Sequence, residues 1–341
     1  MPISLRQSFR SSLAAALLLT AAGCGSNRTE STRVEGMPPP VLTTLHGAGT
    51  SSPLPLFKRW FEELSTQGVK VTYQSVGSGA GILQFGYNMV DFAASDVPMS
   101  AEEVARERRG VVQFPITAGA NVVAYHHKGC NLKLSQAQLV GIFEGTISNY
   151  SQLGCAAKPI QVVVRSDGSG ITANFTAHLS EISPSWKRQV GSAKLVKWPV
   201  GTGAKGNEGV TAQLKKVDGA LGVVNEAYAE PPLQMAALTN GAGQLVKPTD
   251  ESERDALESI DLGPSLSRMD HNPRVGYPLV TFVWILLYET GNGPTDQASL
   301  IKTFGYALSE PAQALAEALG YVSLPQPLLE KSRAALATVQ P

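Results

Sequence analysis

No sign of charge predominates in this chain of 341 residues, since lysine and arginine total 28 and aspartate and glutamate also total 28. A balanced chain argues against a general nucleic-acid or membrane-surface binder, because those partners require a basic excess. Long apolar runs are also lacking after the first residues, and the longest, 279–288, is better explained by a buried strand than by a membrane span. The sequence therefore predicts a soluble globular protein.

Export is predicted by the start of the chain. Arg6 and Arg10 precede the apolar run 13–19, which is too short to span a bilayer and is typical of a secretory signal. The small residues that follow end in Cys24 and resemble a bacterial lipoprotein cleavage site, at which this cysteine becomes the lipidated first residue. The alternative is an ordinary secretory signal that is cut nearby. We expect a lipoprotein signal peptide over 1–23 and attachment to the periplasmic or outer face of a bacterial membrane.

Cysteine is scarce, with three in the chain. Setting Cys24 aside leaves Cys130 and Cys155, and an even pair in an oxidising compartment favours a disulfide. Its loop of about 25 residues would stabilise the fold by about 3.5 kcal/mol in the chain-entropy estimate. Neither cysteine has a histidine at zinc-ligand spacing, so we expect no metal site and no redox role.

The segment Arg165-Ser-Asp-Gly-Ser-Gly170 is the most informative one. It follows the apolar run 160–164 and precedes a helix-like segment that begins near Thr172. A glycine turn at a helix start directs several backbone N–H groups at one spot, which is how proteins hold a phosphate-like anion without a metal. Arg165 adds a planar fork of donors, and Asp167 is interpreted as a turn or helix-capping residue. Taken alone, the segment is equally well explained as a plain capped turn.

Strand-like and helix-like segments alternate along the rest of the chain. Strands are expected at 42–45, 69–76, 90–94 and within 111–125, and helices follow glycine-containing loops. This pattern predicts an α/β protein with mainly parallel strand pairing, whose ligand lies beyond the carboxyl ends of the strands. Three early strand ends carry hydroxyls or a carboxylate, and this repeated placement favours the anion site over the capped turn. The residues concerned are Ser51, Ser52, Ser78 and Asp96.

Six segments resemble, in the same order, the phosphate-binding protein family of the high-affinity phosphate ABC transporter, PstS. They are His46–Pro53, Tyr73–Gly81, Asp91–Ser100, Arg165–Gly170, Lys197–Gly209 and Tyr277–Thr281. The resemblance runs from about residue 42 to about residue 329.

This resemblance implies a two-lobed, type II periplasmic-binding-protein fold with a ligand cleft between the lobes. Lobe one is expected over 41–123 and 277–341, lobe two over 124–276, and a polar tether over 24–40. We expect a monomer without a cofactor and without a nucleic-acid partner. Its partners would be inorganic phosphate, the membrane ABC permease of the phosphate transporter, and the membrane itself through the lipid anchor.

The family's phosphate-binding positions carry over residue by residue. They are Ser51, Ser52 (chiefly through its backbone N–H), Ser78, Asp96, Arg165, Ser169, Gly170 and Ile171. Ile171 departs from the family, whose members usually have threonine there, so only its backbone N–H can donate. Losing one neutral hydrogen bond would weaken binding by about 0.5–1.5 kcal/mol if nothing replaced it.

The resemblance implies a protein that captures inorganic phosphate and delivers it to the permease, and that is not an enzyme. A buried Asp96 can accept a hydrogen bond from protonated phosphate, whereas sulfate has no proton to give. Arg165 would attract the anion and also neutralise Asp96. Two alternatives stay open, an exported phosphate-ester hydrolase and a receptor or sensor for another protonated oxyanion. No metal cluster or serine–histidine spacing in the sequence supports hydrolysis.

Overall fold

The computed structural model describes residues 43–341. Cys24, the signal peptide expected over 1–23 and the tether expected over 24–40 lie outside the described residues. The strands are β1 Thr43–Gly49, β2 Val69–Ser75, β3 Phe92–Ser95, β4 Val111–Tyr125, β5 Lys133–Leu134, β6 Gln161–Arg165, β7 Thr202–Ala204, β8 Ala220–Asn225, β9 Gln234–Met235, β10 Ala237–Thr239, β11 Leu245–Val246 and β12 Val280–Tyr288. The helices are α1 Leu54–Thr66, α2 Ser78–Gly86, α3 Ala101–Arg106, α4 Gln136–Glu144, α5 Gly170–Ile182, α6 Pro184–Gln189, α7 Gly206–Lys216, α8 Asp250–Glu258, α9 Pro294–Ala307, α10 Glu310–Ala318 and α11 Gln326–Leu336, with 3-10 turns η1 Tyr150–Leu153 and η2 Glu226–Tyr228.

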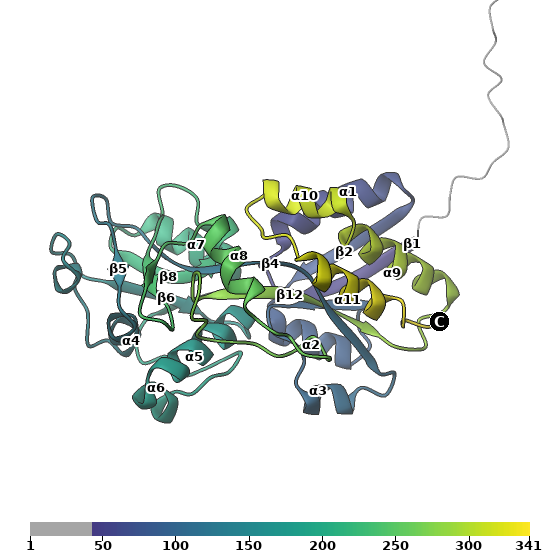
Figure 1. The fold of residues 1–341 in the computed structure, drawn as a ribbon, viewed down its shortest axis with the longest axis horizontal. Helices are drawn as coiled ribbons and strands as arrows, with labels where there is room; N and C mark the ends of the chain where they lie inside the picture. The colour runs from purple at the N-terminus through teal and green to yellow at the C-terminus, as the bar shows by residue number, and fades with distance from the viewer. Residues whose placement is uncertain (1–42) are drawn as a thin grey trace, which may run out of the picture. The chain divides into compact units, whose positions relative to one another are not determined.

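A sheet of nine strands organises the fold, in the order β2-β1-β3-β12-β4-β8-β6-β7, with β9 also paired to β4. Figure 1 shows β4 and β12 between the two sets of helices. β4 is 15 residues long, and its residues 111–120 pair with β12 whereas 121–125 pair with β8. This one long strand therefore belongs to both halves of the sheet. A separate sheet of three strands has the order β11-β10-β5.

The sheet is mixed, not mainly parallel. Pairing is parallel in the outer groups, where β1 lies between β2 and β3 and β6 lies between β7 and β8. β12 runs antiparallel to β3 and β4, and β4 runs antiparallel to β8. The expectation from the sequence is thus wrong for the centre. Helix crossovers make sequential strands parallel, but β12 enters between β3 and β4 from a much later part of the chain, so no crossover sets its direction.

Two hydrophobic cores lie on either side of the shared strand. The first draws on 45–118 and 256–339, and the second on 120–238 with two residues of 277–279. Along β4, Ala118 packs in the first core and Ala120 in the second. We call the parts built on these cores the first half and the second half. The strand is continuous across both cores, so one stretch of backbone connects the two halves.

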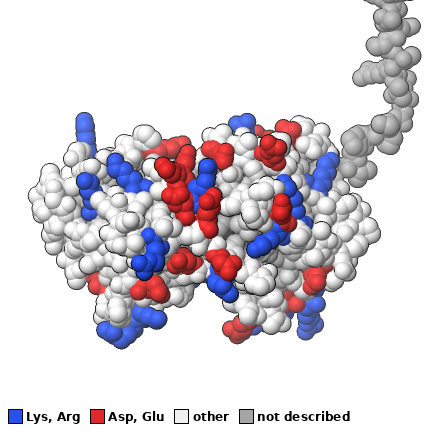
Figure 2. Space-filling view, viewed as in Figure 1, with Lys and Arg blue, Asp and Glu red and all other residues white. Residues whose placement is uncertain are grey.

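Helix α8 packs on the first core through Ala256 and Leu257, and the apolar side chains up to Leu266 follow it there. The sequence leads us to expect this segment in lobe two instead. Its local pattern predicts an apolar face but does not say which core that face covers. The outer face of α8 is acidic, and Figure 2 shows acidic side chains gathered where Figure 1 places this helix. Basic side chains are scattered over the same face (Figure 2), in keeping with the zero formal net charge of the chain.

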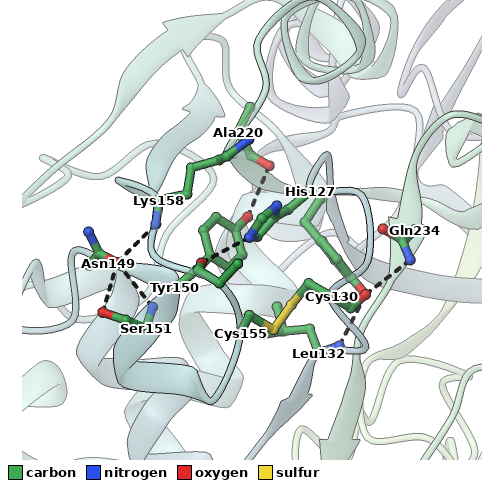
Figure 3. Close-up of a disulfide and its surroundings, with 12 residues drawn as sticks. His127, Cys130, Leu132, Asn149, Tyr150, Ser151, Cys155, Lys158, Ala220 and Gln234 are labelled. Atoms are coloured by element: carbon green, nitrogen blue, oxygen red, sulfur yellow. Dashed lines mark hydrogen bonds between the residues drawn. A yellow bond between two sulfur atoms is a disulfide. The ribbon is translucent and has the colours of Figure 1, made fainter.

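Cys130 and Cys155 form a disulfide, with their Cα atoms 5.3 Å apart, which is the pairing expected from the sequence (Figure 3). Cys130 is buried, and its carbonyl accepts hydrogen bonds from Tyr125 Oη over 2.9 Å and from Gln234 Nε2 over 3.1 Å. The bridge therefore ties the segment after η1 to the end of β4 in the second core.

Candidate functional site

Three serine side chains and one aspartate side chain lie beyond the carboxyl ends of three strands in the first half. Ser51 and Ser52 follow β1, Ser78 begins α2 after β2, and Asp96 follows β3. Each of these four residues has no exposed surface. Ser78 Oγ accepts a hydrogen bond from the backbone N–H of Asp96 over 3.2 Å. The structure therefore brings the predicted residues of the first half into one buried cluster.

Only one of the two carboxylate oxygens of Asp96 has a hydrogen-bond partner among the described residues. Thr50 Oγ1 donates to Asp96 Oδ2 over 2.5 Å, whereas Oδ1 is buried and has no hydrogen-bond partner among residues 43–341. The backbone carbonyl of Asp96 accepts from Asn174 Nδ2 and Thr281 Oγ1, each over 2.8 Å. Burial raises the pKa of Asp96 to about 6, although the hydroxyls of Thr50 and Ser52 and the charge of Arg165 oppose the rise. Near neutral pH the group is therefore mostly a carboxylate with one acceptor to offer.

Arg165, at the end of β6 in the second half, is held by Asp167. Its Nε donates to Asp167 Oδ1 over 2.8 Å and its Nη2 to Oδ2 over 2.5 Å. The backbone N–H of Gly206 also donates to Asp167 Oδ1 over 3.1 Å. Burial alone would raise the pKa of Asp167, but the hydrogen bonds and charge of Arg165 outweigh it and lower that pKa.

Asp167 lies in the bend between β6 and α5, as the turn interpretation expects, but it does not cap the helix. Ser169 caps α5, since its Oγ accepts from the backbone N–H of Thr172 over 3.2 Å. Arg165 acts on Asp96 through its charge, without a direct ion pair between them. Its remaining nitrogen, Nη1, is buried without a hydrogen-bond partner in the described part of the chain. The pair thus leaves one charged N–H group free for a ligand.

Gly170 brings the start of α5 against the first half. A Cβ at this position would lie 2.6 Å from Ser78 Oγ and 2.8 Å from Asp96 Cβ, so no larger residue fits. Nearby, the backbone N–H of Gly79 donates to the carbonyl of Gly168 over 2.9 Å. The predicted residues of both halves therefore lie together, as a site between two lobes requires.

The side chain of Ile171 packs in the second core. It is 1% exposed and lines a small apolar cavity with Phe143, Phe175 and Trp198 in the second core. The first four N–H groups of a helix have no acceptor within it. Ser169 takes the N–H of Thr172, so those of Gly170 and Ile171 are available to an anion. The side chain of Ile171 therefore serves packing, and only its backbone can serve binding.

Sequence reasoning missed the residues that fix the loop after β1. The carbonyls of Thr50, Ser51 and Ser52 each accept a hydrogen bond from a tyrosine hydroxyl. The donors are Tyr73 over 2.8 Å, Tyr228 over 2.7 Å and Tyr321 over 2.7 Å, in that order. These tyrosines come from widely separated segments, so no local pattern could have pointed to them. Asn207, which contacts Ser51 and Ser52, was also missed, although it lies inside one of the segments that resemble the family.

Among the described residues, no group of three or more histidine, cysteine, aspartate or glutamate side chains could hold a metal ion. Within residues 43–341, no helix has the length and apolar character needed to cross a membrane.

Comparison with known proteins identifies the family of this chain. The family model described as a PBP superfamily domain matches residues 36–311. The phosphate-binding protein PstS of Pasteurella multocida (strain Pm70) is 37% identical over 309 residues, which cover 85% of this chain and 89% of that protein. The protein of the same name from Haemophilus influenzae (strain ATCC 51907 / DSM 11121 / KW20 / Rd) is 36% identical over 302 residues, covering 83% and 89%.

Solved structures share the fold. The phosphate-binding protein from Stenotrophomonas maltophilia has a TM-score of 0.71 at 22% identity, covering 86% of this chain and 93% of that one. An ABC-type phosphate transport receptor from Vibrio cholerae has a TM-score of 0.58 at 19% identity, covering 82% and 100%. The six-segment resemblance, the family model and the two relatives agree, and the chain belongs to the PstS family of phosphate-binding proteins.

Proposed function

We propose that this protein binds inorganic phosphate between its two halves and delivers it to a membrane ABC permease for import. The observation that carries the proposal is the pair of buried, unpartnered polar atoms Asp96 Oδ1 and Arg165 Nη1 among the described residues. A buried polar atom without a partner is costly. One free acceptor together with one free charged donor fits a ligand that is both an anion and a proton donor.

Phosphate is such a ligand, because near neutral pH it carries negative charge and still holds a proton. The protonated oxygen of phosphate would donate a hydrogen bond to Asp96 Oδ1, and the other oxygens would accept hydrogen bonds from the donors of the site. Sulfate would set an acceptor against the Asp96 carboxylate, and a site built to receive a hydrogen bond rejects ligands that lack the donor.

The donors that we assign to phosphate come from both halves. Arg165 Nη1 supplies the charged contact, and the N–H groups at the starts of α2 and α5 supply the positive ends of two helix dipoles. The phosphate-binding set is Ser51, the backbone N–H of Ser52, Ser78, Asp96, Arg165, Ser169, Gly170 and the backbone N–H of Ile171.

The two halves would act as lobes that close over the ligand. We propose lobe one over 41–123 and 277–341 and lobe two over 124–276, with small changes that the two cores suggest. The cores meet between Ala118 and Ala120, and the apolar residues of 256–266 belong with lobe one. Closure would bury the anion against the 168–170 loop.

Competition by titration calorimetry tests the proposal, with phosphate, arsenate, sulfate and a phosphonate as ligands. We expect tight binding of phosphate, competition by arsenate, which shares its shape and proton, and rejection of sulfate. Equal affinity for sulfate and phosphate would contradict the role of Asp96. Hydrolysis of a chromogenic phosphate ester by the same preparation would instead favour the enzyme alternative.

Attachment to the membrane through Cys24 is a second part of the proposal. It rests on the small residues that end in this cysteine and on the phosphate-uptake role, which needs the protein near its permease. Replacing Cys24 by serine should release the protein from the membrane fraction or leave its signal uncut. Unchanged membrane association would contradict lipidation.

A further inference from the structure

Asn207 lies at the second residue of α7 and is completely buried. Its backbone N–H donates to Ser51 Oγ over 3.0 Å, and its side-chain Nδ2 donates to the same oxygen over 2.9 Å. Nδ2 also lies 3.4 Å from Ser52 Oγ. One residue of the second half thus makes two hydrogen bonds to one hydroxyl of the first half.

The orientation of the Asn207 amide is fixed by a third contact. Its Oδ1 accepts from the backbone N–H of Asn225 over 3.0 Å. A backbone N–H can only donate, so a flipped amide would set two donors against each other. Nδ2 must therefore face Ser51.

This arrangement determines where the Ser51 proton can go. A hydroxyl has one proton to donate and two lone pairs that accept. Asn207 occupies both lone pairs of Ser51 Oγ, and no residue among 43–341 accepts from this hydroxyl. The carbonyl of Ser51 is held by Tyr228 Oη over 2.7 Å, so the loop cannot easily move the hydroxyl elsewhere. The O–H is left with one direction, into the proposed anion site.

Ser51 differs in this from the other serines of the site. Ser78 Oγ accepts from the N–H of Asp96, and Ser169 Oγ accepts from the N–H of Thr172, each inside its own half. The Ser51 hydroxyl takes its orientation from the opposite half. This hydroxyl is held in one orientation only when the two halves are together. In an open protein it would rotate freely towards water.

We propose that Asn207 is a positioning residue for anion binding, which directs the Ser51 hydroxyl proton onto the ligand as the two halves close. The proposal rests on the phosphate-binding function above and extends it. Asn207 itself need not touch the ligand. Its effect on affinity passes through Ser51, and this makes the role separable from a general contribution to folding.

A double-mutant cycle tests the proposal by phosphate titration of wild type, Asn207→Ala, Ser51→Ala and the double variant. We expect Asn207→Ala to weaken phosphate binding about 10- to 150-fold, the scale of one hydrogen bond to a charged group. In the Ser51→Ala background the same change should cost less than about twofold, because the hydroxyl that it positions is gone. Equal losses in both backgrounds would overturn the proposal and assign Asn207 a purely structural role.

Asn207→Asp sharpens the test. A carboxylate beside Ser51 would accept the hydroxyl proton and turn it away from the anion, so the loss should exceed that of Asn207→Ala. Asn240→Ala is the matched control, a buried asparagine of the second half that bonds to the 244 and 276 backbone away from the site. It should lower the melting temperature without changing phosphate affinity.

A measurement on the wild-type protein covers the case in which the variants do not fold. The backbone N–H of Asn207 bonds across the halves, whereas that of its neighbour Gly206 bonds to Asp167 within one half. By NMR, the Asn207 amide should exchange slowly with phosphate present and faster without it, while the Gly206 amide changes less. Equal responses of the two amides would overturn the proposal. If wild type binds no phosphate at all, the proposed function fails, and this inference falls with it.

Discussion

Arg165 and Asp167, two residues apart at the end of β6, form a two-point ion pair that fixes the plane of the guanidinium. This pair also changes the charge of the site. With Asp96 ionised, two carboxylates accompany one guanidinium before any anion arrives. Net positive charge therefore does not account for anion binding here. In the proposed site, the affinity for an anion would come from local hydrogen-bond donors, which are Arg165 Nη1, serine hydroxyls and helix N–H groups.

Arg165→Ala is expected to weaken binding of every oxyanion by about 2–5 kcal/mol, because a desolvated charge contact is lost and Asp167 loses its partner. Arg165→Lys should recover only part of this, since an ammonium cannot engage Asp167 at two points and the ligand as well. Calorimetric titration of both variants with phosphate measures the losses. Arg188→Ala, an exposed arginine on α6, is the control and should bind like wild type. A lysine variant with full affinity would show that the fork geometry is not needed.

Asp96→Asn should have opposite effects on binding and on stability. Folding raises the pKa of Asp96 from 3.8 to about 6. The stability that the protonated Asp96 contributes to the fold is therefore full below the unfolded pKa and is lost as pH rises through the folded pKa. The ligand-free variant should therefore be more stable than wild type above about pH 6, by about 2–3 kcal/mol. Its phosphate affinity should nevertheless fall and its rejection of sulfate should shrink, because an amide offers a donor where the ligand proton should go.

Urea unfolding without ligand and titration with both anions measure the two effects of Asp96→Asn. Wild-type phosphate binding should also weaken below about pH 6, as the carboxylate takes up a proton of its own. Retention of full phosphate affinity together with full sulfate rejection would exclude Asp96 as the acceptor of the ligand proton.

Much of the site could be predicted from the sequence because its parts are local. Ser78 at the start of α2, Asp96 after β3 and Ser169 at the cap of α5 each sit at a strand end followed by a turn, which a one-dimensional pattern can reveal. The long strand β4 also lies where the apolar run 111–125 predicts strand, since such a run is typical of a strand buried on both faces. Cys130 and Cys155 were the only pair left once Cys24 was set aside.

Other parts depend on contacts that no local pattern contains. Asp167 has the sequence context of a turn residue, and only the direction of the Arg165 side chain makes it an ion-pair partner. Asn207 reaches Ser51 from the opposite half, at a separation of 156 residues. The place of β12 between β3 and β4 is decided by pairing across most of the chain. Such features are set by packing and sheet topology, where the sequence offers several compatible solutions.

Gly170→Ala tests whether the closeness of the two halves is needed for binding. The added Cβ would lie 2.6 Å from Ser78 Oγ and 2.8 Å from Asp96 Cβ, so the halves could no longer close fully. We expect phosphate affinity to fall by more than about tenfold, or 1.4 kcal/mol, with little change in ligand-free stability. Gly305→Ala is the matched control, since its Cβ in α9 would meet nothing within 4 Å and should stabilise by about 0.5–1 kcal/mol. Unchanged affinity of Gly170→Ala would show that this approach does not matter for binding.

Glu253, on α8, is a buried carboxyl group outside the proposed site, with 1% of its surface exposed. Its Oε1 has no hydrogen-bond partner among the described residues. Burial raises the pKa of Glu253 far above its usual range, and the neighbouring carboxyl groups of Glu226 and Asp250 raise it further. Near neutral pH the folded protein therefore holds this group protonated, whereas the unfolded chain has released the proton.

The stability of the fold should consequently fall as pH rises above the ordinary pKa of a glutamate, because the folded state binds more protons than the unfolded state. Glu253→Gln keeps the shape of the protonated acid and removes its titration. The variant should match wild type near about pH 4 and exceed its free energy of unfolding by about 1–3 kcal/mol near about pH 8. Urea denaturation at both pH values measures this, with the exposed Glu251→Gln on the same helix as the control, expected within about 0.5 kcal/mol of wild type. Parallel stability curves for wild type and Glu253→Gln across this range would mean that Glu253 is ionised in the folded protein and that its charge is compensated within the fold.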